Sequence, residues 1–180
     1  MVETASALAD AEGLAAVTVR RLGDALGIST MSVYTHVNGR DDLLVLMADA
    51  ACARMPRPGH GTAGWRTRVR RVAEANLALL LEHPWLLEID DDRTAFGPGT
   101  IAKYDHELHA LDPLDLADVA RDAALTFVLD FVRGAARARR RDPGPRRCRR
   151  SGPAGRGGSR STWATPTRWR SVWAARRGRR

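Results

Sequence analysis

The sequence predicts an all-α protein with an N-terminal three-helix helix-turn-helix domain and a C-terminal antiparallel helical domain, followed by a disordered or aberrant basic tail. Apolar residues recur at intervals of three and four along most of the first 139 residues, which is the period of an amphipathic helix. Capping residues and glycines separate these stretches. A hydrophobic fraction of 44% over 180 residues is typical of a globular protein.

The helix-turn-helix domain is expected over residues 1–55. Its helical stretches begin near residues that cap a helix, or end at a glycine or before a proline. The expected helices are residues 2–12, the segment from the cap Thr18 to Gly27, the segment from Ser29 or Thr30 to about Val37, and the segment from Asp41 up to Met55.

A linker rich in Pro and Gly, residues 56–64, is expected to lead to the second domain, residues 65–139. Helices are expected at 65–82, 100–111 and 115 to about 139, with a short apolar segment at 85–89 and a loop at 90–99. The first of them ends at His83, because the residue before a proline avoids the helical conformation. The residues expected to face inward are Val69, Val72, Ala73, Asn76, Leu77, Leu80, Leu116, Val119, Ala123, Phe127, Val128 and Phe131.

The basic character of the chain belongs to its last quarter. The net charge is +8, but residues 1–136 hold 13 basic and 20 acidic residues, whereas residues 137–180 hold 16 arginines and one acid. Residues 140–180 are rich in Arg, Gly, Pro and Ser without helical periodicity, which predicts disorder. Because a GC-rich gene read out of frame yields such a string, we hypothesise a frameshift near Arg140. Stacking of its tryptophans on nucleic-acid bases is the alternative.

Two glycines predict the helix-turn-helix. Gly27 is expected to take a positive φ at a sharp turn, and Gly23, one helical turn earlier, lets the two helices approach closely. A small core is then expected from Leu22, Leu26, Ile28 and Val33. Such a pair of helices can place the second one in the major groove of DNA.

The outer face of that second helix is polar. It carries Ser29, Thr30, Met31, Ser32, Tyr34, Thr35 and His36. Short hydroxyls and an aromatic ring can approach base edges or phosphates, and Arg40, just beyond the helix, is placed to meet a phosphate. Because the helix lacks Arg, Asn and Gln, we expect contacts to thymine methyl groups through Met31 or Thr30 rather than bidentate reading of a base.

These residues stand in a segment, from about Val2 to Ala51, that resembles the DNA-binding domain of the tetracycline-repressor family. The resemblance is most specific in LGISTMSVYTHVNGRDDLL. The stretches EHPWLLEI and LDLADVARDAALTFVLDFVRGAA are similar to the C-terminal domains of that family, with less specificity. By position, the resemblance implies phosphate contacts for Thr18 and Arg20 and base contacts for residues 30–32. It also implies contacts to the DNA backbone for Tyr34, His36 and Arg40.

The resemblance further implies an all-helical homodimer that binds a palindromic operator in double-stranded DNA and releases it when a small-molecule effector enters the C-terminal domain. The sequence therefore predicts a sequence-specific transcriptional regulator, a repressor released by an effector. The alternative is a helical small-molecule-binding or interaction module that has lost operator binding, because an arginine-rich string stands where the family has further dimer helices. Candidates for the effector pocket are Trp65, Trp85, Tyr104, Phe127 and Phe131, although aromatics at helical spacing are more often core.

Other classes of protein are disfavoured. No Ser-His-Asp set, Cys-His pair or glycine-rich phosphate loop is apparent, so we expect no enzyme. His106 and His109 have a spacing that can hold a metal, but a solvated helix face explains them better, and we expect neither metal nor cofactor. Cys52 and Cys148 lie far apart in unlike contexts, which indicates a reducing cytoplasm. No secretory signal or apolar run of the ~18–20 residues needed to cross a membrane is present.

Overall fold

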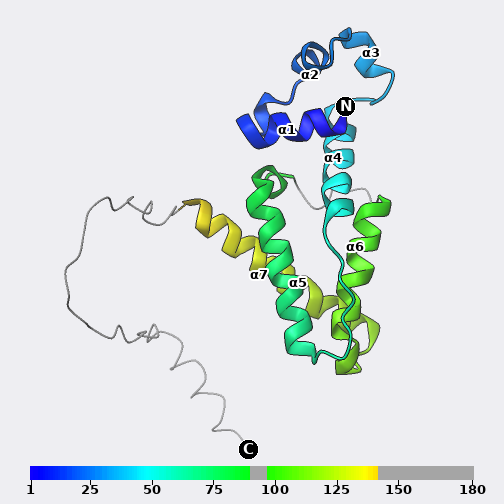
Figure 1. Cartoon of the computed structure of the whole chain (residues 1–180), viewed down its shortest axis with the longest axis vertical. Helices are drawn as coiled ribbons and strands as arrows, with labels where there is room; N and C mark the ends of the chain where they lie inside the picture. Colours follow the sequence, from blue (N-terminus) through cyan, green and yellow to red (C-terminus); the bar gives the residue numbers. More distant parts are fainter. Residues whose placement is uncertain (90–96, 142–180) are drawn as a thin grey trace, which may run out of the picture. The chain divides into compact units, whose positions relative to one another are not determined.

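The computed structural model describes residues 1–89 and 97–141, and within these ranges every regular element is a helix. The predicted fold class is therefore confirmed (Figure 1). The elements are α1 (Val2–Glu12), η1 (Leu14–Ala16), α2 (Val19–Leu26), α3 (Thr30–Tyr34), α4 (Arg40–Arg54), α5 (Trp65–Glu82), η2 (Pro84–Leu87), α6 (Pro98–Leu108), η4 (His109–Leu114) and α7 (Asp118–Arg141). The predicted tail from Asp142 onward, with its disorder or frameshift, lies outside the described residues.

Local hydrogen bonds set the ends of α2 and α3. The Thr18 hydroxyl accepts from the Arg21 backbone N–H at 3.2 Å, so Thr18 caps α2 as predicted. Of the two residues expected to cap α3, Ser29 does so, accepting from the Ser32 N–H at 3.1 Å. The helix α3 ends at Tyr34, earlier than the expected Val37. Beyond it, the Asn38 backbone N–H and side-chain amide donate to the Asp42 carboxylate at the start of α4.

The turn between α2 and α3 depends on both glycines, as predicted. Gly27 has φ 67° and ψ 27°, the left-handed region that favours glycine. A Cβ atom at Gly23 would lie 2.8 Å from the Ile28 carbonyl oxygen, so only glycine fits there. Leu22 and Val33 are buried as expected, but the Ile28 side chain is 39% exposed. The expectation for Ile28 is wrong, because its backbone rather than its side chain packs against α2.

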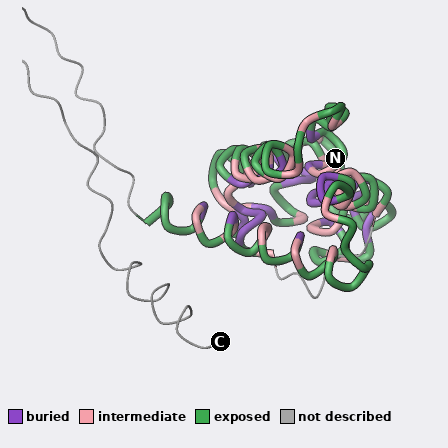
Figure 2. Tube along the Cα trace, turned by 90° about the horizontal axis from the view of Figure 1, so that it is seen from below, coloured by how far each residue is buried: buried purple, intermediate pink, exposed green. Residues whose placement is uncertain are grey.

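One hydrophobic core extends from the helix-turn-helix into the C-terminal half. It joins Leu22 and Val33 to Ala5 of α1, Met47 of α4 and Trp85 of η2, and it continues to α7. A smaller core lies between α5, η4 and α7. Figure 2 shows buried positions where the helices face one another and exposed positions on their outer sides. The two domains expected from the sequence therefore share a core.

The helix α7 packs through a different face from the expected one. Leu125, Val132 and Ala136 are buried, whereas Val119, Phe127 and Phe131 are 84%, 73% and 71% exposed. The expected inward face is therefore wrong for these residues and for Leu116, which precedes α7 and is 37% exposed. The helix carries two apolar stripes, and helical periodicity cannot tell which one meets the core.

The remaining elements follow the expected pattern with shifted ends. The helix α6 runs over Pro98–Leu108 and continues as η4, whereas one helix over 100–111 was expected. Asn76 is buried on the inner face of α5, as expected. No helix within residues 1–89 and 97–141 combines the length and the apolar character needed to cross a membrane.

Replacing Gly23 by Ala should destabilise the fold by about 1–3 kcal/mol, because the new methyl group must displace a backbone carbonyl. Urea unfolding followed by circular dichroism measures this change. The control is Gly64→Ala, where a Cβ meets no atom within 4 Å and φ is −66°. Equal stabilities of the two variants would contradict the close contact.

Candidate nucleic-acid interface and ligand cavity

The helices α2 and α3 lie at one end of the described unit and present a surface to solvent (Figure 1). Met31 and Tyr34 are 74% and 52% exposed on it. All ten residues predicted to contact DNA are exposed or half-buried: Thr18, Arg20, Ser29, Thr30, Met31, Ser32, Tyr34, Thr35, His36 and Arg40. A large apolar side chain held in solvent at the tip of a short helix is free to contact another molecule.

Several of these residues also hold the helices together. Thr18 and Ser29 are N-caps, and the Ser29 and Ser32 hydroxyl oxygens lie 3.0 Å apart. The Thr35 hydroxyl donates to the Ser32 carbonyl at 2.7 Å. Of the ten, the residues whose side chains make no hydrogen bond inside the described chain are therefore Arg20, Thr30, Met31, Tyr34 and His36.

Three of the four arginines in residues 1–55 are engaged within the protein. Arg21 makes a two-bond contact with Glu12 at 2.5 and 2.7 Å, which lowers the pKa of that carboxyl. Arg54 pairs with Glu3 at 2.7 Å. The Arg40 guanidinium donates to the Leu14 carbonyl at 3.0 Å and so ties α4 to η1. Within the described residues, Arg20 alone of the four makes no ion pair or hydrogen bond through its side chain.

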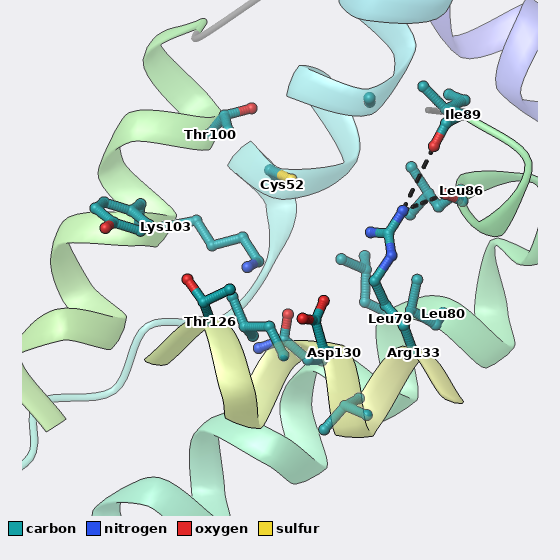
Figure 3. A pocket seen from close by; sticks show the side chains of 15 residues that line it. Cys52, Leu79, Leu80, Leu86, Ile89, Thr100, Lys103, Thr126, Asp130 and Arg133 are labelled. Atoms are coloured by element: carbon teal, nitrogen blue, oxygen red, sulfur yellow. Dashed lines mark hydrogen bonds between the residues drawn. The ribbon is translucent and has the colours of Figure 1, made fainter. Parts of the chain in front are cut away.

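A cavity of about 260 Å³ opens between α4, α5, η2, α6 and α7 (Figure 3). Its walls are mainly apolar, with Leu79, Leu86 and Leu129 among the residues that line it. Lys103 from α6 and Asp130 and Arg133 from α7 extend into the same space in Figure 3. An apolar space with a few convergent polar groups is the usual form of a small-molecule site.

A buried polar network forms one side of this cavity. The Lys103 ammonium lies 2.8 Å from Glu107 Oε2, and Asn76 Nδ2 donates to Glu107 Oε1 at 2.6 Å. Glu107 is only 1% exposed. A charge this deep requires its partners, because an unpaired buried carboxylate is costly. The sequence analysis missed this network, although Asn76 on an apolar face and the i,i+4 spacing of Lys103 and Glu107 are signals for it.

Only one of the five aromatic residues expected in the pocket lines this cavity. Tyr104 lines it, and a hydrogen bond to Asp122 raises the pKa of the Tyr104 hydroxyl. Phe127 and Phe131 lie on the exposed stripe of α7, outside the cavity. These two residues do not line this cavity, because α7 turns its other apolar stripe inward.

The two tryptophans are also placed elsewhere. Trp85 is 1% exposed and points toward α1, where its indole Nε1–H donates to Asp10 Oδ1 at 2.7 Å. Trp65 begins α5 and lies under the Arg66 guanidinium, 4.3 Å from the ring centre. Neither residue lines this cavity, because helical position alone does not show which element each ring meets.

Cys52 and Thr100 line the cavity near α4. Burial raises the pKa of the Cys52 thiol, which keeps it protonated at neutral pH. The Thr100 hydroxyl oxygen is buried without a nitrogen or oxygen partner. Its neighbour is the Cys52 thiol, and the interaction with Thr100 partly offsets the effect of burial on the pKa of that thiol.

The two histidines weighed as metal ligands face different neighbours. The His106 ring stacks on His60 with 4.5 Å between centres, and its pKa is lowered by burial and by the nearby His60. His109 pairs with Asp112 at 3.1 Å. Within the described part of the chain, no group of three residues could hold a metal ion.

The α4–α6 contact joins the cavity to the helix-turn-helix. The Asp49 carboxylate of α4 accepts the backbone N–H groups of Gly99 and Thr100, at 3.2 and 2.7 Å, at the start of α6. A Cβ atom at Gly99 would lie 2.4 Å from the Asp49 carbonyl oxygen, so the two helices are in close contact. A carboxylate at this end of a helix also interacts favourably with the helix dipole.

Removing the Lys103 charge should destabilise the protein strongly. We expect Lys103→Met to cost about 3–5 kcal/mol, because Glu107 is left buried and unpaired. The double variant Lys103→Met with Glu107→Gln should recover most of this loss. The control is Arg54→Met at the exposed Arg54–Glu3 pair, which should cost about 1 kcal/mol or less in the same urea titration. No recovery in the double variant would contradict a stabilising role for the pairing.

Comparison with known proteins gives a consistent family. Residues 55–156 match the tetracyclin repressor-like, C-terminal domain family, which is more than half of the chain. The HTH-type transcriptional repressor DrrR1 of Streptomyces coeruleorubidus is 37% identical over 143 residues, covering 77% of this chain and 52% of DrrR1. An HTH-type transcriptional regulator of Saccharopolyspora erythraea is 28% identical over 138 residues, covering 77% of this chain and 58% of the relative. The chain thus spans about half the length of these curated relatives.

Solved structures of other proteins support the same family. The Streptomyces coelicolor TetR family protein ActR, in complex with actinorhodin, superposes with a TM-score of 0.71 at 29% identity, covering 79% of this chain and 68% of that one. Apo ActR gives the same TM-score and identity and covers 70% of its chain. With the helix-turn-helix, the cavity and the match over residues 55–156, the chain belongs to the tetracycline repressor (TetR) family.

Proposed function

We propose that this chain is a DNA-binding transcriptional repressor that binds a palindromic operator as a homodimer and is released by a small molecule. The observation that carries the proposal is the outward face of α3, held in place by the Gly23 contact and the left-handed Gly27. It projects Met31 and Tyr34 into solvent without partners in the described chain. The similarity to the repressor DrrR1 and to the transcriptional regulator of Saccharopolyspora erythraea supports it. DNA binding places its site of action in the cytoplasm.

Within this surface the residues have different proposed roles. Thr30, Met31 and Ser32 would face base edges, and Tyr34 and His36 would contact the DNA backbone. Arg20 supplies a free positive charge for a phosphate. The Thr18 and Ser29 hydroxyl oxygens accept backbone N–H groups, so their O–H groups can donate to a phosphate. The Thr35 O–H donates to Ser32, so this hydroxyl keeps lone pairs that can accept from a base amino group. Arg40 keeps further N–H groups beyond the one that reaches Leu14.

The cavity between α4 and α7 is the proposed effector site. Its size and walls suit a small organic molecule with an apolar body and a few polar groups, which would meet Lys103, Thr100 or Asp130. The similarity to ActR, which was solved in complex with actinorhodin, supports a small-molecule ligand. Because α6 carries Lys103 and is capped by Asp49, a molecule in the cavity acts on the same helix that contacts α4.

A gel shift with the DNA upstream of the gene tests the proposal. Wild-type protein should retard this DNA specifically at low salt. Arg20→Ala should weaken binding to every sequence and lower the salt slope by about 1, since one phosphate contact is lost. Thr30→Val should change the preferred bases. Arg21→Ala is the matched control, because its guanidinium is engaged by Glu12 and its loss should change affinity less.

Absence of any specific shift by the wild-type protein would contradict the repressor proposal. It would favour a helical ligand-binding module without operator recognition. A shift that is lost equally in Arg20→Ala and Arg21→Ala would contradict the proposed role of Arg20.

The exposed stripe of α7 is the proposed dimer interface. Val119, Phe127 and Phe131 lie on one side of the helix and are each more than two-thirds exposed. An apolar stripe of this kind marks an interaction surface. A dimer is also what two half-sites of a palindromic operator require.

Replacing Phe131 by Asp should yield a monomer in sedimentation velocity, because a charge would be buried at the interface. Helix content should remain unchanged by circular dichroism. The control is Ile101→Asp, a 53% exposed apolar residue of α6 outside the stripe. A Phe131→Asp protein that stays dimeric would assign the interface to another surface.

A further inference from the structure

The short helix η2 faces the cavity on one side and the core shared with α1 on the other. On one side, Leu86 and the following Ile89 line the cavity. On the other side, Trp85 is buried in the core shared with α1. The segment is therefore a wall of the cavity and a support for the helix-turn-helix at once.

Asp10, near the end of α1, receives the hydrogen bonds from that support. Its Oδ1 accepts from Trp85 Nε1 at 2.7 Å and lies 2.8 Å from His83 Nδ1. The Trp85 ring is fixed by burial, so the direction of its N–H group is fixed as well. A carboxylate held by two ring nitrogens can satisfy both only in one orientation of α1.

The backbone of η2 is held from its other end by α7. Arg133 lies 3.5 and 3.4 Å from the carbonyl oxygens of Leu86 and Ile89, and Arg137 lies 3.3 Å from that of Leu87. Figure 3 shows the Arg133 bonds at the edge of the cavity, which Arg133 also lines. A molecule in the cavity therefore touches the groups that hold η2.

We propose that Asp10 is a positioning residue that fixes the orientation of the DNA-binding helices on η2, so that displacement of Leu86, Ile89 or Arg133 at the cavity moves α1. The link is separate from the covalent connection through α4, because Asp10 belongs to α1. This inference rests on the proposed function only where it predicts an effect on DNA binding.

Hydrogen exchange of the free full-length protein tests the link directly. Asp10→Ala and Trp85→Phe, which keeps a ring but removes the N–H donor, should lower protection of α1 amides about tenfold relative to α5. Arg133→Gln, a change at the cavity, should also lower protection of α1 amides about tenfold relative to α5. The matched controls are Glu3→Ala, another acid of α1, and Thr126→Val, which lines the cavity on α7 away from η2. Both controls should leave α1 protection within about twofold of wild type.

Operator binding gives the second measurement, with DNAs whose half-site spacing differs by one base pair. A loss of general stability weakens binding to all spacings alike, whereas a positioning role changes their ranking. The double variant Asp10→Ala with Arg133→Gln should also be non-additive by about fivefold in affinity, and Asp10→Ala with Thr126→Val additive.

Uniform loss of protection in α1 and α5, or unchanged α1 protection in Asp10→Ala and Arg133→Gln, would overturn the inference while leaving the repressor proposal intact. If the wild-type protein binds no DNA, the repressor proposal fails, and the exchange measurement alone decides the link.

Discussion

The core that α1, α4, η2 and α7 share is the constraint on which the rest of the molecule depends. It joins the residues that support α3, the proposed reading helix, to those that back the cavity, with Met47 and Trp85 among its fully buried members. Close-packed interiors do not deform smoothly, so a change of volume on one side of such a core must be met by a shift of whole elements. The cavity and the proposed reading surface of α3 rest on this one core, so a shift of elements at one of them is transmitted to the other.

Polar contacts fix the relative orientation of the elements that share this core. Asp49 accepts two backbone N–H groups of α6, and Asp10 lies against two ring nitrogens from the segment that includes η2. Each contact joins an element beside the cavity to a helix of the first 55 residues, α4 or α1. Hydrogen bonds are directional, whereas apolar burial is not. The core therefore holds the elements together, and the two carboxylates select one relative orientation.

The sequence predicts the N-terminal half well because its signals are local. A cap bonds to a residue three positions away, and the demand for glycine at Gly23 and Gly27 arises within a single turn. The cavity depends on tertiary packing instead. Periodicity marked Phe127 and Phe131 as inward, yet α7 has two apolar stripes, and only the position of α5 and η2 decides which is covered. The contact between Asp10 and Trp85 spans 75 residues, and no local pattern indicates it.

The charges explain why the proposed DNA affinity depends on assembly. The first 55 residues hold four arginines and seven acids, and three of those arginines are already engaged within the protein. Phosphate neutralisation supplies much of the affinity of DNA-binding proteins, so we expect one such unit alone to bind a single half-site weakly. In the proposed dimer, two units joined through the exposed stripe of α7 would present two copies of α3 and two Arg20 side chains. Once one half-site is bound, the second unit would meet the other half-site at a high effective concentration. On this proposal, the exposed phenylalanines of α7 would matter to DNA binding as much as the residues proposed to face the bases, since they would decide whether two weak contacts act together.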